Sequence, residues 1–404
     1  MTNPWRDLRG FPVEVWVLFF ATLINRAGTM ALPFLALYLT RALGHTASQA
    51  GFALTVYGVG ALLTAPLAGR MADRIGPVRI LKTSLFLSGA IIVFLPVLSS
   101  YPAILALTLL WAVVSEAFRP AVLTVITDLV EPAQRKPVIA LNRLAVNLGF
   151  SIGPAVGGFL AMVSFPALFI VDGATSILAG VIVALAPWKT HHAPAAHDEV
   201  AGKRRGFGRL LVAGDTRFIM LLLAMIPAMM VFFQLQAAMP IFLVRDLHMP
   251  ESDYGLLISI NTLMVVLIEV PLNTVMASWP HRLTLPVGAL LTGAGFGAMA
   301  LASTFWGVAV TVVIWTFGEI LLIPSSAACV ADLAPPGRRG EYMGLYTMSF
   351  SMAFSMASLA GTATLERFGP TILWGGAFAV GALSAVLIWG ITDDRRIKNT
   401  NSAS

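Results

Sequence analysis

Residues 69–79 read GRMADRIGPVR, a short charged stretch between two long apolar runs, residues 49–68 and 83–99. Each run has the length that an α-helix needs to cross the hydrocarbon core of a bilayer, roughly 17–25 residues. A short basic loop between two such runs is typical of the connection between consecutive transmembrane helices. The stretch therefore predicts a helical hairpin in a membrane protein.

The same apolar pattern extends along the chain in both directions. The 404 residues are 57% hydrophobic and 11% charged, against roughly 25% charged residues in a soluble domain, and the mean hydropathy is +0.83. So much apolar surface needs lipid as its solvent, and we expect an all-α integral membrane fold with twelve transmembrane helices. They are predicted near residues 13–39, 49–68, 83–99, 103–127, 138–162, 165–187, 218–243, 254–278, 284–302, 305–331, 342–364 and 370–391.

Lysine and arginine are unevenly distributed between the two sets of loops. With both termini placed in the cytoplasm, the cytoplasmic segments hold 20 of the 26 basic residues and the outer loops hold only Arg41, Arg245 and Arg367. This asymmetry favours that orientation. The chain is expected to cross an inner (plasma) membrane many times. The first residues show no short apolar core with a small-residue cleavage site, so we expect no cleaved signal peptide.

The longest polar stretch divides the chain into two parts with six predicted helices each. We expect an N-terminal bundle over residues 1–187, a cytoplasmic linker over 188–217 and a C-terminal bundle over 218–404. Three linker histidines allow a metal-binding interpretation, but no cysteine or ordered acidic partner accompanies them. A solvated linker near anionic lipid is favoured, and no metal site is predicted. The histidines are His191, His192 and His197.

The two halves repeat one another. Three features of the first half recur 204 residues later, namely a proline, an Asp-Leu pair and an arginine. An internal duplication of this kind is typical of parallel repeats in transporters, where the substrate path lies between the halves near the midplane. The matching positions are Pro120 and Pro324, Asp128 and Asp332, and Arg135 and Arg339.

The charged stretch at residues 69–79 resembles the signature of the major facilitator superfamily, Gly-x-x-x-Asp-Arg-x-Gly-Arg-Lys. The match includes Gly69, Asp73, Arg74 and Gly76, and one basic residue of the final pair is kept at Arg79. The resemblance implies a conformational latch. Asp73 would accept hydrogen bonds from the start of a neighbouring helix, or pair with a cytoplasmic arginine, and so hold the outward-facing state.

Residues 149–158 read GFSIGPAVGG and resemble the antiporter motif of the same superfamily, Gly-x-x-x-Gly-Pro-x-x-Gly-Gly, which is associated with exporters. The first three glycines share one helical face, where a neighbouring helix can approach closely, and the proline can kink the helix. A seal that closes one side of a cavity and plain tight packing both fit this pattern. The motif residues are Gly149, Gly153, Pro154, Gly157 and Gly158.

Ionisable residues inside the predicted helices are the candidates for proton coupling and substrate binding. A charged side chain at a helix centre costs roughly 2.5–3.5 kcal/mol on insertion scales. Such a group persists only if it is paired, neutralised or facing water. Four lie near mid-helix and the last lies nearer the outer end: Arg26, Glu116, Glu269, Glu319 and Asp172.

Two pairings of these charges are possible from the sequence. Arg26 can reach Glu116, and Glu116 can alternatively pair with Arg119, three residues further along the helix. A pair between Arg26 and Glu116 would leave Glu269 and Glu319 as the proton carriers, because proton and substrate can compete for one carboxylate. The structural alternative is that each carboxylate is hydrogen-bonded within its own half.

Adaptable apolar side chains suggest a permissive cavity wall. Methionine fits many shapes, and aromatic faces attract organic cations. Core or lipid-facing positions are the alternative, and several intramembrane asparagines leave a polar substrate possible. The predicted lining residues are Met229, Phe233, Gln236 and Met352.

The resemblance implies a drug:proton antiporter, a proton-coupled secondary transporter that exports small lipophilic or cationic compounds by alternating access. Its expected partners are a small-molecule substrate, protons and the lipid bilayer, with no nucleic acid, and it is expected to be a monomer. The proton gradient supplies the energy, so no cofactor is expected. Export of a polar metabolite such as a sugar or siderophore, and a non-transporting membrane sensor, are the alternatives. An enzyme is not expected, because the histidines and the single Cys329 form no nucleophile or metal constellation.

Overall fold

The computed structural model describes residues 10–188, 215–276, 279–335 and 338–392, and every regular element in these ranges is helical. Eleven helices within them are long and apolar enough to cross a membrane. The longest, α14 (Arg339–Thr392), is two helices joined at Gly369, whose φ of 79° is a conformation that residues with a Cβ rarely adopt. The chain therefore makes twelve crossings, which confirms the predicted all-α fold.

The two halves have matching element orders. The first half contains α1 (Val13–Ala27), α2 (Ala31–Leu37), η2 (Tyr38–Ala42), α3 (Ala47–Ile75), α4 (Pro77–Phe94), α5 (Tyr101–Ser115), α6 (Phe118–Leu129), α7 (Pro132–Val163) and α8 (Phe165–Leu185). The second half contains α9 (Thr216–Phe232), α10 (Ala238–Ile241), η7 (Phe242–Asp246), α11 (Glu251–Val275), α12 (His281–Ala298), α13 (Phe305–Leu333) and α14. The short π-helical segments η2 and η7 recur 204 residues apart, at the offset of the sequence repeat.

Local signals in the sequence explain where several helices begin. Prolines occupy the first turn of α4, α5, α7 and α8, where their missing N–H costs no helical hydrogen bond. Ser164 ends α7 in an extended conformation, and its side chain accepts a hydrogen bond from the Ala167 N–H at the start of α8. The turn predicted between the fifth and sixth membrane helices is thus confirmed.

The charged stretch at residues 69–79 is not the loop that the sequence suggested. Helix α3 continues to Ile75, and the break before α4 is made at Gly76, whose φ of 90° favours glycine. Arg79 is exposed in the first turn of α4. Gly69 and the side chains of Asp73 and Arg74 lie outside the described part of the structure, so the latch stays a prediction.

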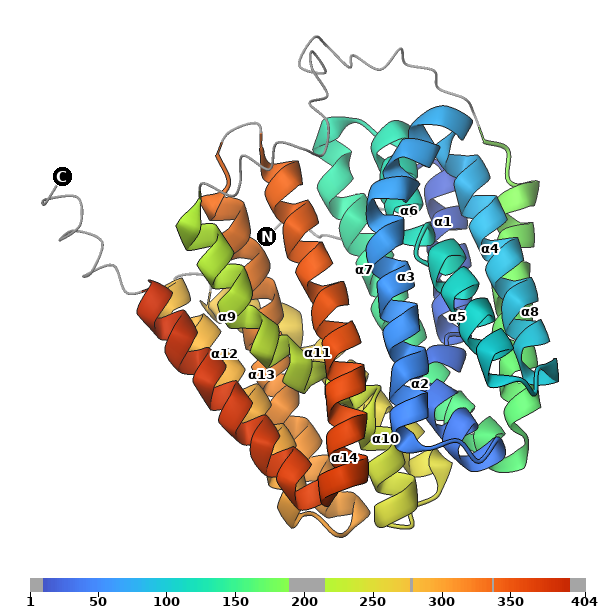
Figure 1. Ribbon diagram of the computed structural model, residues 1–404. Helices are drawn as coiled ribbons and strands as arrows, with labels where there is room; N and C mark the ends of the chain where they lie inside the picture. Colours follow the sequence, from blue (N-terminus) through green and yellow to red (C-terminus); the bar gives the residue numbers. More distant parts are fainter. Residues whose placement is uncertain (1–9, 189–214, 277–278, 336–337, 393–404) are drawn as a thin grey trace, which may run out of the picture.

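The halves lie side by side, with the helices of the first half on the right in Figure 1 and most of those of the second half on the left. Helix α8 ends and α9 begins at the same end of the molecule, which we call the linker side. The opposite end, with the turn at Ser164 and the kink at Gly369, is called the far side. The linker predicted over residues 188–217 lies almost entirely outside the described residues.

The buried apolar side chains are arranged differently at the two ends. Each half has a hydrophobic core of its own toward the linker side, around Ile126 in the first half and Leu322 in the second. A third core includes Leu35, Leu54 and Met239, and it combines residues of both halves toward the far side. The halves are therefore packed together at the far side and have separate cores at the linker side.

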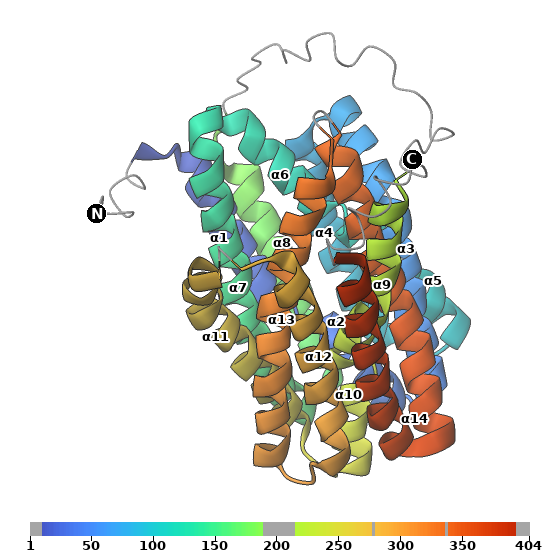
Figure 2. The same ribbon diagram turned by 90° about the vertical axis from the view of Figure 1, so that its left-hand side faces the viewer.

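Two helix pairs form most of the seam between the halves, α7 with α11 and α3 with α14. Figure 2 shows α7 and α11 side by side. Close approach is made by glycines near the far side: a Cβ at Gly255 of α11 would collide with the Pro154 carbonyl oxygen, and one at Gly51 of α3 would collide with Thr362. At the linker side, Figure 1 shows α3 and α14 farther apart.

Candidate functional site

Glu319 lies within α13, and its carboxylate accepts a hydrogen bond from a neutral side chain of the same half. The Asn261 amide donates a hydrogen bond to the Glu319 carboxylate at 2.7 Å and another to the Thr316 hydroxyl at 3.0 Å. Asn261 is only 3% exposed. Among the described residues, no cation lies within ion-pair distance of Glu319. A carboxylate with only a neutral partner can exchange a proton without first breaking an ion pair.

Glu269 has a partner that the sequence analysis did not assign. The Arg143 Nη2 atom of α7 lies 2.6 Å from the Glu269 Oε1 atom of α11, so the ion pair crosses the seam between the halves. This arrangement argues against Glu269 as an unpartnered proton carrier. The signal in the sequence was a pair of opposite charges in two apolar runs, but they lie 126 positions apart. Its location suggests that the pair holds α7 and α11 together.

Exchanging these two charges tests the cross-seam ion pair. We expect Arg143→Glu and Glu269→Arg each to slow transport about tenfold or more, because each places like charges at the seam in place of a charge-assisted hydrogen bond. The double variant should recover most of the lost rate, since it restores the attraction with reversed polarity. Transport rates of the four proteins in liposomes give the comparison. A double variant as slow as the slower single variant would exclude this pairing.

Glu116 lies in the break between α5 and α6, and not in mid-helix as the sequence suggested. The Tyr57 hydroxyl of α3 donates a hydrogen bond to its carboxylate at 3.1 Å and lies 3.2 Å from the Ser115 hydroxyl. Arg119 lies beyond the break, in the first turn of α6, and no ion pair joins it to Glu116. Among the described side chains, Glu116 forms no ion pair within 4 Å.

Arg26 of α1 is not paired with Glu116, which corrects that prediction. Its guanidinium carbon lies 5.2 Å from the centre of the Phe118 ring and 5.6 Å from that of Phe150. The buried Nε atom has no hydrogen-bond partner among the described atoms. The Glu116 carboxylate instead accepts from Tyr57. Two aromatic rings therefore flank the cation, and neutral residues replace the expected carboxylate partner.

Asp172 has a geometry that favours a structural role. One oxygen of this buried carboxylate accepts hydrogen bonds from the backbone N–H groups of Met30 and Ala31, at 2.9 and 2.7 Å. These groups belong to the start of α2, where N–H donors lack intrahelical partners and negative charge is favourable. Asp172 of α8 thus fixes the junction between α1 and α2, and its suggested coupling role stays without support.

Removing this carboxylate should weaken the fold. We expect Asp172→Ala to lower the free energy of unfolding by about 2–4 kcal/mol, because two buried N–H groups lose their acceptor. Asp172→Asn should have a smaller effect, since its amide oxygen can accept from one of them. Thermal melting in detergent measures both, with Asp332→Ala as the control because that side chain is largely exposed. Melting of Asp172→Ala at the wild-type temperature would contradict the structural role.

The antiporter motif on α7 packs against two neighbours. Three of its glycines face the junction of α1 and α2, where an added Cβ would press on Arg26, on the Thr29 carbonyl or on Met30. The other end of the motif faces α11 across the seam. The motif therefore makes close contacts both within the first half and across the seam. The contacts are Gly149, Gly153 and Gly157 with the first half, and Gly158 and the Pro154 carbonyl with Ser252 and Gly255.

The residues predicted to line a cavity differ in their exposure. Phe233 is half-buried, with its ring centre 5.3 Å from that of Phe354 in α14. Met352 is 38% exposed on the same helix. Gln236 is half-buried in the break between α9 and α10. The prediction that Met229 lines a cavity is wrong, because this residue is 2% exposed and packed in the core of the second half.

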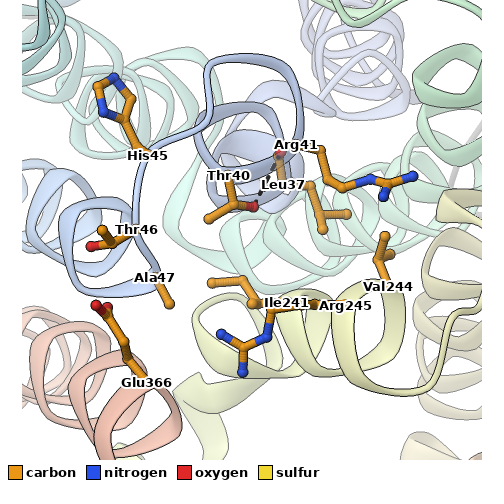
Figure 3. A pocket seen from close by; sticks show the side chains of 10 residues that line it. All are labelled: Leu37, Thr40, Arg41, His45, Thr46, Ala47, Ile241, Val244, Arg245 and Glu366. Carbon is orange, nitrogen blue, oxygen red and sulfur yellow. Dashed lines mark hydrogen bonds between the residues drawn. The ribbon is translucent and has the colours of Figure 1, made fainter.

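A pocket of about 270 Å³ lies at the far side, where the halves meet. Figure 3 shows side chains from both halves around it, among them Arg41 and Thr40 of the first half and Arg245 and Glu366 of the second. Polar contacts here tie the halves together: the Arg41 Nε atom lies 3.4 Å from a Glu251 oxygen, and the Ser48 N–H donates to Glu366 at 2.6 Å. The far-side closure is therefore polar as well as apolar.

No three His, Cys, Asp or Glu side chains among the described residues gather into a possible metal site. The linker residues His191, His192 and His197 lie outside the described part of the chain. Their metal-binding interpretation is therefore untested.

The Major Facilitator Superfamily model matches residues 18–250 and 221–404. The chain belongs to the major facilitator superfamily. It is a multi-pass membrane protein of a transporter family, not an enzyme family. It is 24% identical, over an alignment of 410 residues, to a Na(+), Li(+), K(+)/H(+) antiporter of Planococcus maritimus, with 93% of this chain and 95% of that protein covered.

Other major facilitator proteins broaden the comparison. The quinolone resistance protein NorA of Staphylococcus aureus (strain N315) is 26% identical over 170 residues, which cover 42% of this chain and 44% of that protein. The crystal structure of a D-xylose-proton symporter superposes with a TM-score of 0.78 at 15% identity, covering 94% of this chain and 97% of that one. This structural likeness shows the fold, and the relatives differ in what they carry.

Proposed function

We propose that this major facilitator protein is a proton-coupled exporter of small lipophilic compounds that works by alternating access. The observation that carries the proposal is Glu319. Its carboxylate is half-buried in a membrane-spanning helix and has a neutral amide as its hydrogen-bond partner. A polar group at this depth is costly and is by default a candidate for a proton or substrate pathway.

The packing of the halves supports alternating access. A shared core and close glycine contacts join them at the far side, whereas their cores are separate at the linker side. The distribution of basic residues favours a cytoplasmic linker side, with both termini cytoplasmic. In that orientation this structure is the inward-facing state, and rocking of the halves about the seam would open the far side.

Three features favour proton-driven export over import. The sequence carries the exporter-associated motif on α7, and its Gly158 and Pro154 contact α11 across the seam. One relative over most of the chain is named as an antiporter that exchanges cations with protons, and a relative over part of it as a quinolone resistance protein. The half-buried Phe233, the ring of Phe354 and the exposed Met352 supply an adaptable apolar wall.

Flux measurements in liposomes test this proposal. The purified protein is reconstituted with a pH-sensitive dye inside, and proton movement is recorded on addition of ethidium, naphthalene-2-sulfonate or xylose under an imposed pH gradient. We expect at least one aromatic probe, and not xylose, to drive proton movement that vanishes without protein. Proton movement with xylose alone would favour the polar-metabolite alternative, and none with any probe would count against proton coupling.

A further inference from the structure

Arg26 is an intramembrane cation whose hydrogen-bonding capacity is not used. It forms no ion pair or side-chain hydrogen bond with the described residues, and its buried Nε atom lacks an acceptor. An arginine side chain presents five N–H donors in a planar fork and stays charged. Leaving such a group unpaired in a membrane protein is costly, so its retention calls for an acceptor that arrives from outside the chain.

The carboxylates near Arg26 accept hydrogen bonds from other donors. Glu116 and Asp172 are near enough to Arg26 to interact electrostatically, as are Tyr57 and Arg119. Glu116 accepts from the Tyr57 hydroxyl, and Asp172 accepts from two backbone N–H groups of α2. The second arginine, Arg119, is exposed and adds positive charge to the same region.

The surroundings of Arg26 place it beside the seam. The Phe150 ring flanks its guanidinium, and the Phe150 carbonyl accepts a hydrogen bond from the Thr262 hydroxyl of α11 at 3.4 Å. Tyr57, the partner of Glu116, has its ring centre 6.3 Å from that of Phe354 in the second half. Arg26 is itself only half-buried. A ligand between the halves can therefore reach both the guanidinium and aromatic rings.

We propose that Arg26, held between Phe118 and Phe150, binds an anionic group of the substrate, a carboxylate or a sulfonate on an aromatic body. This inference rests on the proposed transport function and names the substrate class of its site. The planar fork of arginine matches the oxygens of such groups in a bidentate contact. The rings stack against the flat faces of both the guanidinium and the ligand. A permanent organic cation could make no such contact with the Arg26 guanidinium.

Binding of three matched probes tests the inference. Naphthalene-2-sulfonate, naphthalene-2-sulfonamide and 2-naphthyl-trimethylammonium share one ring system and differ in charge. In lipid nanodiscs we expect the sulfonate to bind wild-type protein about tenfold or more tightly than the sulfonamide, as hydrogen bonds to charged groups predict. Arg26→Gln should remove that preference and weaken sulfonamide binding much less than sulfonate binding. Arg26→Lys should recover only part of it, because lysine lacks the fork.

Folding and nonspecific charge are controlled separately. Because Arg26 has no hydrogen-bond or ion-pair partner among the described residues, Arg26→Gln should melt at the wild-type temperature or above it. Arg367→Gln removes an exposed arginine at the far-side turn of α14 and should keep the sulfonate preference. A sulfonate preference that persists in Arg26→Gln overturns the inference, as does tightest binding of the trimethylammonium probe or equal binding of sulfonate and sulfonamide to the folded wild type.

The two proposals fail in distinguishable ways. Proton movement in liposomes with no Arg26-dependent sulfonate preference would keep the proton-coupled function and exclude the anionic substrate class. Arg26-dependent sulfonate binding without any proton movement would keep the binding site and exclude proton coupling.

Discussion

We expect Glu319→Gln to abolish proton movement coupled to substrate, while downhill movement of substrate continues. The amide has nearly the volume of the carboxyl group and can still bond to Asn261, so the local packing of α11 against α13 survives. The amide cannot bind and release a proton at the pH values at which a carboxyl group does so. We expect the coupled proton flux to fall at least ~100-fold, the size of effect typical of a lost proton-transfer group.

The measurement uses liposomes with an internal pH dye and a naphthalene probe outside. Glu341→Gln is the matched control, because this carboxylate at the start of α14 is paired with Arg338 away from the seam. Asn261→Ala should reduce coupling less, since the carboxyl group itself remains. Wild-type coupling in Glu319→Gln would remove this residue from the mechanism and direct attention to Glu116.

We expect Gly255→Leu to lock the transporter with its far side open and to stop turnover. The added side chain would enter the contact between α11 and the Pro154 carbonyl of α7, where not even a Cβ fits. Both walls of that contact are backbone, so the clash cannot be relieved by a rotamer change, and the seal must separate. We expect the transport rate to fall ~100-fold, since overpacking typically costs about 1–3 kcal/mol and here opposes one obligatory state.

Distances between spin labels on the far-side turns before α3 and α11 report the outcome. They should lengthen in Gly255→Leu and keep their wild-type distribution in Gly344→Leu, where no atom outside that residue's own helix lies within 4 Å of an added Cβ. The single native cysteine, Cys329, is buried and forms no disulfide, so a spin label reacts preferentially with cysteines introduced at the surface. Normal transport in Gly255→Leu would show that the glycine contact is packing and not a seal.

The sequence by itself determined the architecture of this protein. Twelve apolar runs predicted the twelve crossings, because each helix satisfies its own backbone within the bilayer and needs no distant partner to be recognised. The offset of 204 residues predicted two equivalent halves, and the two π-helical segments recur at that same spacing. Residues 149–158 likewise predicted close helix contacts, because the absence of a Cβ is a property of glycine itself.

Only the tertiary structure decided which charged groups meet. Arg143 pairs with Glu269, 126 positions along the chain, and Asp172 binds the start of α2, 141 positions away. Glu116 lies at the break between α5 and α6 and accepts a hydrogen bond from Tyr57. Periodicity places a residue on a face of its own helix. It does not give the rotation and depth of one helix relative to another, which result from the packing of all the helices together. For this reason Arg26 and Glu116 could be predicted from the sequence as site residues, but the partners predicted for them were wrong.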